Sequence, residues 1–295
     1  MRVILMCAIL ILMMACKQEN KLATLQEQIA NELNTQEGVF AVAFKDLQSG
    51  EELLMNASEV FHAASTMKTP VMIEVYKQAA EGRWSLSDSI EVKNVFSSIV
   101  DGSAYSLNAD DDSEKELYTK VGQKATLYDL TYDMIIMSSN LATNIVIEYV
   151  DAKKVTQTMR GMGAKDIQVL RGVEDGKAYQ QGLNNTTTAY DLMLIFEQLA
   201  SGKAVNAAAS EAMIDILLDQ KFKDMIPAQL PAEVKVAHKT GSITGVRHDS
   251  GIVFLPDGRK YVLVLLSKQM PQPKEGVAAM ANVSKMIYDY MLSNK

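Results

Sequence analysis

The stretch SGIVFLPDGRKYVLVLLS, residues 250–267, carries the clearest structural signal in the chain. Residues 250–255 and 261–267 are short runs rich in aliphatic and β-branched side chains, which favour extended strands. Between them stands Pro256-Asp257-Gly258, and these three residue types in series are typical of a tight turn. The stretch therefore predicts a β-hairpin near the C-terminus.

Strand and helix patterns recur on both sides of this hairpin. Residues 39–47 alternate as a strand does, and residues 48–51 predict a turn into a second strand around 53–55. Residues 21–33 carry an apolar stripe at helical spacing. A closing helix is expected from about Gly276 to Leu292.

The middle of the chain, from Ser65 to about Leu217, has predominantly helical patterns. Strands near both termini, with helices between them, predict an α+β fold in which one antiparallel sheet is flanked by terminal helices and carries an inserted all-helical lobe. We expect an α/β lobe of residues 21–64 and 218–295 and a helical lobe of residues 65–217. The cleft between two such lobes is where a small-molecule site is expected.

Residues 1–15 have the layout of an export signal. Arg2 precedes an apolar run that is too short for a comfortable bilayer span and ends in a small residue before Cys16. Residues 12–16 resemble a bacterial lipobox, in which the cysteine becomes lipid-modified. We therefore expect a periplasmic mature chain, 16–295, attached to a membrane through a lipid on Cys16. An ordinary signal peptide or an uncleaved anchor is the alternative.

The composition narrows the classes of partner. Cys7 and Cys16 are the two cysteines of the chain and both lie in the leader, so the mature chain has no disulfide to form. Without Arg2 it has 28 basic and 36 acidic residues, a net charge of −8, which argues against a nucleic-acid partner. The acidic run 110–114 lacks the ligand spacing of a Ca²⁺ loop and is expected to be a solvated loop. No histidine pair has metal-ligand spacing, so we expect no metal. We also expect no cofactor and a monomeric chain.

Ser65 and Lys68 stand three residues apart at the start of a helical run. On a helix this spacing puts both side chains on one face, with Cβ atoms about 5–6 Å apart. A serine hydroxyl needs a nearby base to become a nucleophile, and a lysine buried between lobes loses proton affinity and can serve as that base. Alone, the pattern is also compatible with a capping serine and a surface lysine.

Two further polar groups follow in order. Ser138-Ser139-Asn140 ends the apolar run 130–137, and its hydroxyl and amide could relay a proton and bind a substrate amide. Lys239-Thr240-Gly241-Ser242 follows the strand-like run 234–237 and offers a cation, a hydroxyl and a glycine that permits close approach to the strand edge. Taken singly, each group is also compatible with an ordinary turn or edge strand.

The ordered set Ser-x-x-Lys, Ser-x-Asn and Lys-Thr-Gly, with gaps of about 70 and 100 residues, resembles the class A β-lactamases and penicillin-binding proteins. The flanking residues extend the resemblance. Phe61–Lys68 is similar to the family's Phe-x-x-Ala-Ser-x-x-Lys stretch, and Met137–Asn144 to its Met-Ser-Asp-Asn-x-Ala-x-Asn helix. Thr186-Thr187-Thr188 resembles the threonines that end its Ω loop. The resemblance covers essentially the whole mature chain and implies the β-lactamase/transpeptidase-like fold.

The resemblance also implies roles for individual residues. Ser65 would attack a lactam carbonyl, Lys68 would help remove its proton, and Ser138 would pass a proton to the departing nitrogen. Backbone N–H groups of Ser65 and Ser242 would form the oxyanion hole. The residues expected to bind the substrate are Asn140, Lys239, Thr240, Gly241 and Arg247. Pairing of Arg247 with Asp249, which would leave both structural, is the favoured alternative for that arginine.

Two departures from the family pattern matter. The middle residue of the second group is Ser139 instead of aspartate, which we expect to change the support of the turn. In the loop region 171–185, the family's deacylating glutamate of Glu-x-x-Leu-Asn is replaced by Gln180, which cannot act as a base. Glu174 is the one glutamate in this region and a candidate base. Pairing with Arg171 or with solvent is its alternative role.

The resemblance implies β-lactam hydrolysis through a serine acyl-enzyme. A peptidase or esterase of the penicillin-binding type, which acylates and then stalls, is the first alternative. A lipoprotein that binds cell-wall peptides without turnover is the second. The presence of a deacylating base would distinguish β-lactam hydrolysis from acylation without turnover.

Overall fold

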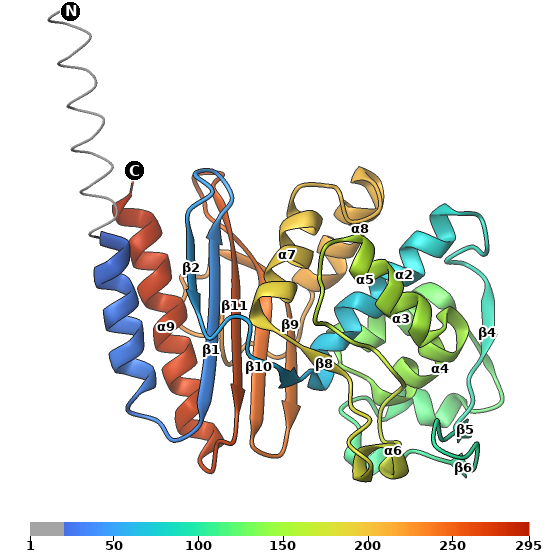
Figure 1. Ribbon diagram of the computed structural model, residues 1–295. Coiled ribbons are helices and arrows are strands. Elements are labelled where there is room, and N and C mark those ends of the chain that lie inside the picture. Colours follow the sequence, from blue (N-terminus) through green and yellow to red (C-terminus); the bar gives the residue numbers. More distant parts are fainter. Residues whose placement is uncertain (1–20, 295) are drawn as a thin grey trace, which may run out of the picture.

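The computed structural model describes residues 21–294, so the predicted leader with Cys16 lies outside the described part of the chain. Its centre is a five-stranded antiparallel sheet in the order β2-β1-β11-β10-β9 (Figure 1). The strands are β1 (Val39–Asp46), β2 (Glu52–Met55), β9 (Lys235–Ile243), β10 (Val246–Phe254) and β11 (Lys260–Lys268). Because β1 pairs with β11, both ends of the chain build one sheet, and the predicted α+β fold is confirmed.

The predicted C-terminal hairpin is present as β10 and β11, and both strands are longer than the sequence pattern indicated. Alternate residues along β11 enter two different cores. Leu263 and Leu265 pack with the terminal helices, whereas Val262 and Val264 pack with helices from the middle of the chain. A strand with both faces buried is apolar along its whole length, which explains the continuous apolar run in the sequence.

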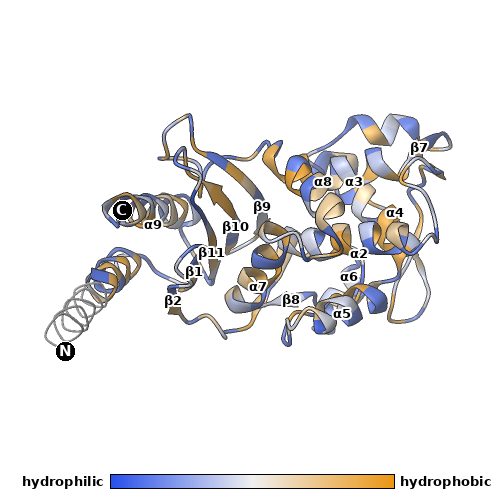
Figure 2. Ribbon diagram, turned by 90° about the horizontal axis from the view of Figure 1, so that it is seen from above, coloured by the Kyte–Doolittle hydropathy of each residue, from blue (hydrophilic) through white to orange (hydrophobic). Residues whose placement is uncertain are grey.

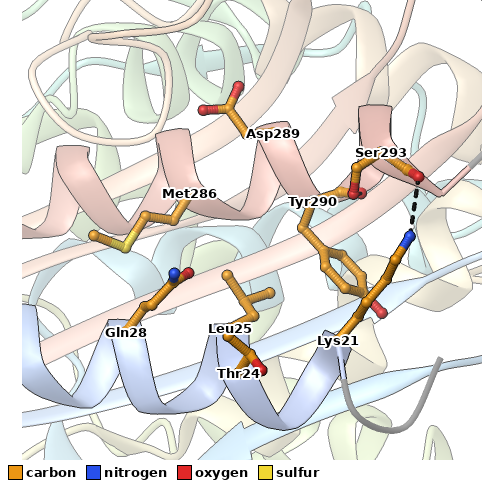
Figure 3. A pocket seen from close by; sticks show the side chains of 8 residues that line it. All are labelled: Lys21, Thr24, Leu25, Gln28, Met286, Asp289, Tyr290 and Ser293. Atoms are coloured by element: carbon orange, nitrogen blue, oxygen red, sulfur yellow. Dashed lines mark hydrogen bonds between the residues drawn. The ribbon is translucent and has the colours of Figure 1, made fainter. Parts of the chain in front are cut away.

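Two terminal helices cover one face of the sheet (Figure 2). The described part of the first helix is 21–33, and α9 spans Pro273–Ser293, so both predicted terminal helices are confirmed. Figure 3 shows the two helices side by side, with Lys21 Nζ donating to the carbonyl oxygen of Ser293 at 3.2 Å. Within the described residues, no helix is both long enough and apolar enough to cross a membrane.

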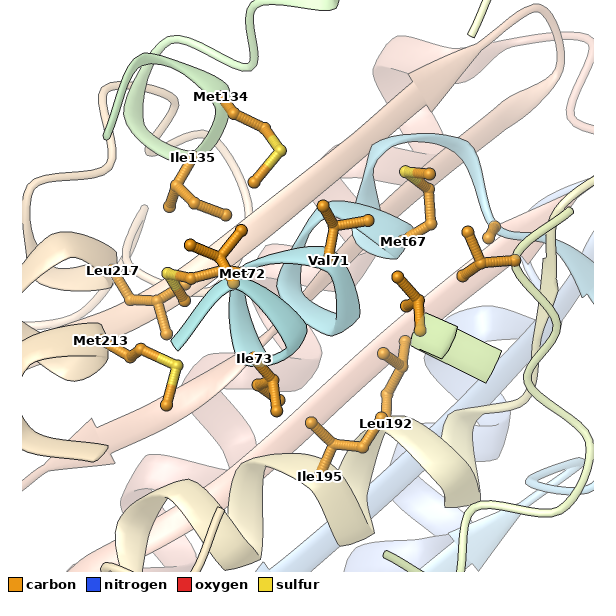
Figure 4. Packing of buried hydrophobic residues seen from close by; sticks show 14 of the residues in the cluster. Met67, Val71, Met72, Ile73, Met134, Ile135, Leu192, Ile195, Met213 and Leu217 are labelled. Carbon is orange, nitrogen blue, oxygen red and sulfur yellow. The ribbon is translucent and has the colours of Figure 1, made fainter. Parts of the chain in front are cut away.

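Helices from the middle of the chain lie on the other face (Figure 2). They are α2 (Lys68–Ala80), α3 (Leu127–Ile136), α4 (Asn140–Val150), α5 (Ala152–Gly161), α6 (Gly176–Gln180), α7 (Ala189–Ala200) and α8 (Ala207–Leu218). Figure 4 shows Val71, Met72 and Ile73 of α2 surrounded by apolar side chains of α3, α7 and α8. Since α7 packs directly on β1, β10 and β11, it joins the helical part to the sheet.

Short segments complete the helical part and its junction with the sheet. They are β3 (Phe61–His62), η1 (Ala64–Met67), β4 (Ser89–Glu91), β5 (Phe96–Ser97), β6 (Ala104–Tyr105), η2 (Ala109–Asp111), η3 (Glu116–Lys120), β7 (Lys124–Thr126) and β8 (Thr186–Thr187). The pairing of β3 with β8 ties the segment before η1 to the segment that follows α6. This tie positions the start of α2 next to the loop that contains α6.

Candidate active site

A cleft of about 660 Å³ lies where β9, an edge strand of the sheet, faces the helical part. Its walls come from six segments distant in sequence: residues 62–65, residues 111–113, the turn before α4, residues 171–185, residues 222–225, and β9 with the turn and the start of the strand that follow it. The lining residues include Ser65, Ser138, Asn140, Glu174, Thr240, Gly241, Ser242 and Arg247. The fold therefore brings the predicted site residues together, while Lys68 and Lys239 are fully buried and reach the site through Ser138.

Ser65 lies in η1, which leads directly into α2. The preceding residue, Ala64, has a left-handed backbone with φ of +45°, and this sharp entry leaves the Ser65 side chain partly exposed to the cleft. β9 passes close to this turn, because a Cβ atom on Gly241 would lie 3.2 Å from the backbone nitrogen of Ser65. Glycine at 241 thus allows the strand edge to approach the backbone of Ser65.

Lys68 is the first residue of α2, and its amine makes all its hydrogen bonds with the turn before α4. Nζ donates to the Ser138 carbonyl at 2.6 Å, to Ser138 Oγ at 3.2 Å and to Asn140 Oδ1 at 3.0 Å. Burial lowers the pKa of Lys68 to about 7, against a smaller opposing effect of the Asp112 and Glu174 carboxylates. A fraction of this lysine is therefore neutral at neutral pH and able to accept a proton.

Ser138 connects the two buried lysines. Its hydroxyl accepts from Lys68 Nζ at 3.2 Å and from Lys239 Nζ at 3.1 Å. Burial and the neighbouring Lys68 charge hold the pKa of Lys239 well below its usual value. Ser138 itself has a left-handed backbone, with φ of +57°, which projects its side chain between the two amines. A hydroxyl that contacts two such amines can move a proton between them and a ligand.

Glu174 faces the same turn from the opposite wall of the cleft. Asn140 Nδ2 donates to Glu174 Oε1 at 3.4 Å, so this carboxylate stands next to the group that also accepts from Lys68. The alternative pairing of Glu174 with Arg171 is not observed, because the Arg171 guanidinium donates to Leu183 O, Gly172 O and Asn184 Oδ1. Gln180 lies exposed at the end of α6 and does not line the cleft.

The residues on either side of Glu174 are anchored. Asn144 Oδ1 accepts from the Val173 N–H at 2.6 Å, and its Nδ2 donates to the Val173 carbonyl at 3.0 Å. On the other side, the buried Asp175 carboxylate accepts from Ser98 Oγ and from the Ile99 N–H, both at 2.9 Å. These anchors hold Glu174 in its left-handed conformation, with φ of +61°. Sequence reasoning missed Ser98 and Asp175, because no pattern links residues 77 positions apart.

Arg247 and Asp249 do not form the predicted pair. Arg247 Nη1 donates to the carbonyl oxygens of Ile243 and Val246, at 2.8 and 2.7 Å, and the side chain lines the cleft. The buried Asp249 pairs with His238 Nδ1 at 2.8 Å. In the sheet register Asp249 opposes Thr240, which makes His238 its diagonal cross-strand neighbour and the nearer partner.

The acidic run 110–114 is only partly solvated. Asp110 and Asp111 are exposed, as predicted, but Asp112 is 5% exposed and lies against the start of α4. The prediction of a solvated loop is wrong at this residue, because the unpaired N–H groups of a helix N-terminus provide donors that the local sequence does not show. Among residues 21–294, no group of histidine, aspartate and glutamate side chains is arranged to hold a metal ion.

Comparison with known proteins relates this chain to proteins named as beta-lactamases. The family model described as "Beta-lactamase enzyme family" matches residues 24–291. A protein named beta-lactamase from Bacteroides uniformis is 29% identical over 181 residues, covering 56% of this chain. The match spans 60% of that relative's own length.

Two solved structures extend the comparison to nearly the whole described chain. The crystal structure of a beta-lactamase from Sphaerobacter thermophilus has a TM-score of 0.78 and 26% identity, covering 90% of this chain and 97% of that one. A variant of PBP-A in an acyl-enzyme complex with penicillin G also has a TM-score of 0.78, with 25% identity, covering 92% of this chain and 97% of that one.

Proposed function

Because this chain belongs to the beta-lactamase enzyme family, we propose that it hydrolyses β-lactams through an acyl-enzyme formed on Ser65. The observation that carries the proposal is the burial of the Lys68 amine against the 138–140 turn. Burial lowers the pKa of this amine to about 7, which suits a base that works near neutral pH. Lys68 follows Ser65 by three residues and contacts the Ser138 hydroxyl at 3.2 Å. The proposed nucleophile and proton relay therefore line one cleft, and the buried base contacts the relay.

Acylation would use these three groups in sequence. Ser65 Oγ bonds to the lactam carbonyl carbon while its proton passes to neutral Lys68. The lactam C–N bond then breaks, and the nitrogen takes the proton of the Ser138 hydroxyl. Lys68, hydrogen-bonded to that hydroxyl, returns a proton to it and becomes neutral again. The products of this half-reaction are an ester on Ser65 and a neutral secondary amine, so the net proton transfer is from Ser65 to the lactam nitrogen.

The cleft also offers groups that would hold the substrate. The N–H groups of Ser65 and Ser242 would stabilise the oxyanion, an effect worth about 2.7–4 kcal/mol per donor. Thr240, in the edge strand β9, and Arg247, at the start of β10, line the same wall and suit a substrate carboxylate. Lys239 adds positive charge behind Ser138, and Asn140 suits the amide of the acylamino side chain.

Deacylation would depend on Glu174. Glu174 lines the cleft and contacts Asn140, and from there its carboxylate would take a proton from a water that attacks the Ser65 ester. The proton on Glu174 then returns to Ser65 Oγ as the ester C–O bond breaks. This route would give turnover although Gln180 stands at the position where the family pattern has its glutamate.

A penicillin-binding activity without turnover is the second candidate. The observations that favour it are Gln180 and the similarity to PBP-A, a variant of which has been solved as an acyl-enzyme with penicillin G. In that case Ser65 would be acylated by penicillins, and its natural substrate would be a cell-wall peptide or an ester.

One kinetic experiment separates the two candidates. Purified protein is mixed with a chromogenic cephalosporin, and both the burst and the steady rate are recorded. Sustained turnover supports the β-lactamase function, whereas one equivalent of product followed by arrest supports the penicillin-binding function. Ser65→Ala serves as the control, and full activity in this variant would refute acylation of Ser65.

We further propose that the chain is an exported lipoprotein modified at Cys16, on the lipobox-like residues 12–16. The test compares membrane and soluble fractions of cells expressing the wild type and Cys16→Ala, with mass spectrometry of the mature N-terminus. A soluble wild-type protein, or an unmodified Cys16, would contradict the proposal.

A further inference from the structure

We propose that Asp112 is a positioning residue of the active site, whose buried carboxylate fastens the 138–140 turn and sets the charge around Lys68. This inference deepens the proposed function and rests on it, since it concerns the residues that would carry acylation. Asp112 belongs to the acidic run that the sequence suggested was merely solvated, and no recognisable motif includes it.

Hydrogen bonds hold the Asp112 carboxylate against the start of α4. Its Oδ2 atom accepts the backbone N–H of Asn140 at 2.9 Å and that of Leu141 at 3.0 Å. The same oxygen accepts from the Tyr118 hydroxyl at 2.9 Å. A buried carboxylate with three donors on one oxygen, at the N-terminus of α4, is strongly held in place.

Lys68 donates to the oxygen atoms of the 138–140 turn, whereas Asp112 accepts the backbone N–H groups of Asn140 and Leu141. Ser139, the middle residue of the turn, uses its hydroxyl to accept the Ala142 N–H as the N-cap of α4. Next to Asp112, Ser113 Oγ donates to the Met137 carbonyl at 2.8 Å. Residues 112 and 113 therefore tie down both ends of the turn, and the left-handed Ser138 stands between the two ties.

The charge of Asp112 also acts on the Lys68 amine. The charged groups that act on the Lys68 amine are the carboxylates of Asp112 and Glu174 and the amine of Lys239. Of the two carboxylates, Asp112 has the larger effect in raising the pKa of Lys68 against the effect of burial. Removing the Asp112 charge therefore lowers the pKa of Lys68 further, while removing its oxygen atoms also loosens the turn.

The experiment measures the acylation rate of Ser65 against pH by stopped flow, with a chromogenic cephalosporin, for the wild type, Asp112→Asn and Asp112→Ala. Asp110→Asn is the matched control, because Asp110 is exposed in the same acidic run and pairs with Lys115. We expect the plateau rate of Asp112→Ala to fall on the order of a hundredfold through misplacement of the turn. Asp112→Asn keeps the shape and should lose less rate.

The pH midpoint tests the positioning role directly. In Asp112→Asn the rise of the acylation rate should begin at lower pH than in the wild type, whereas Asp110→Asn should match the wild type. A wild-type plateau and midpoint in Asp112→Asn would overturn the inference while leaving Ser65 acylation intact. If Asp112→Ala does not fold, Asp112→Asn still decides the question.

A second readout does not depend on catalysis. The pKa of Lys68 is followed by ¹³C NMR of lysine-labelled protein, with Lys68→Met to assign the signal. A lower Lys68 pKa in Asp112→Asn supports the inference even if the wild type does not react with the cephalosporin, which would count against the proposed function alone. An unchanged Lys68 pKa overturns the electrostatic role of Asp112.

Discussion

The side chains of Glu174 and Asn140 meet across the cleft, with Asn140 Nδ2 donating to Glu174 Oε1 at 3.4 Å. Asn140 Oδ1 accepts from Lys68 at the same time, so a single amide separates the proposed acylation base from the proposed deacylation base. The two bases reach the Asn140 amide from different segments, Lys68 from α2 and Glu174 from the loop before α6. The two halves of the proposed reaction can therefore be disturbed separately.

Glu174→Gln should trap the acyl-enzyme. An amide cannot take a proton from water, so we expect deacylation to slow by roughly 10²–10⁴-fold, the usual contribution of general base catalysis. The burst with a cephalosporin should remain, and intact-protein mass spectrometry should show a stable adduct on Ser65. Adding Gln180→Glu to this variant should not restore turnover, because residue 180 lies outside the cleft. Steady turnover in Glu174→Gln would exclude Glu174 as the base.

The acylation rate should rise as the pH increases through about 7. Burial lowers the pKa of Lys68 to about 7, and the proposed reaction needs the neutral amine, so the active fraction grows as Lys68 loses its proton. Single-turnover rates between pH 5 and 9 measure this midpoint. A flat profile across that range would show that Lys68 is not the titrating base.

Gly172→Ala should damage deacylation more than acylation. A Cβ atom at 172 would lie 2.3 Å from Asn144 Oδ1, the atom that accepts the Val173 N–H. The anchor next to Glu174 must then shift, and overpacking of this kind costs about 1–3 kcal/mol of stability. The ratio of burst to steady rate measures the selective effect. Gly176→Ala is the control, since a Cβ there meets no atom within 4 Å.

The folded state should lose stability as the pH falls from about 6.5 to about 4. Burial lowers the pKa of His248 to about 4, below its unfolded value of about 6.5, so in this window the unfolded state binds the extra proton. Full titration of His248 over this window lowers the free energy of unfolding by on the order of 3 kcal/mol. Urea unfolding of the wild type and of His248→Gln measures it.

In that comparison the variant should be less stable than the wild type at pH 7, because in the native state His248 Nε2 donates to the His62 carbonyl and His248 Nδ1 accepts from the Ser267 N–H. Its stability should nevertheless depend less on pH between 4 and 6.5. Identical slopes for both proteins would contradict a neutral, buried His248. The pKa of His62 is also lowered, chiefly by burial, so part of the slope should persist in both proteins.

Much of the fold could be predicted because its signals are local. The hairpin of β10 and β11, the terminal helices and the Ser65–Lys68 spacing are each encoded in a short continuous stretch of sequence. The predicted β9 was too short, since the sequence placed Lys239–Ser242 after the strand and the structure has these residues inside it. Their pairing with β10, which the sequence pattern did not show, keeps them extended.

The sequence by itself determined the C-terminal hairpin, the terminal helices and the one-turn spacing of Ser65 and Lys68, because periodicity and short spacing follow directly from backbone geometry. Only the tertiary structure decided that Glu174, and not residue 180, faces Asn140, that Asp249 pairs with His238, and that Asp112 lies under the 138–140 turn. These relationships join residues 11 to 34 positions apart. They depend on tertiary packing and burial, which decide the nearest partner of each group. Contacts of this kind produce no periodic pattern in the amino-acid sequence.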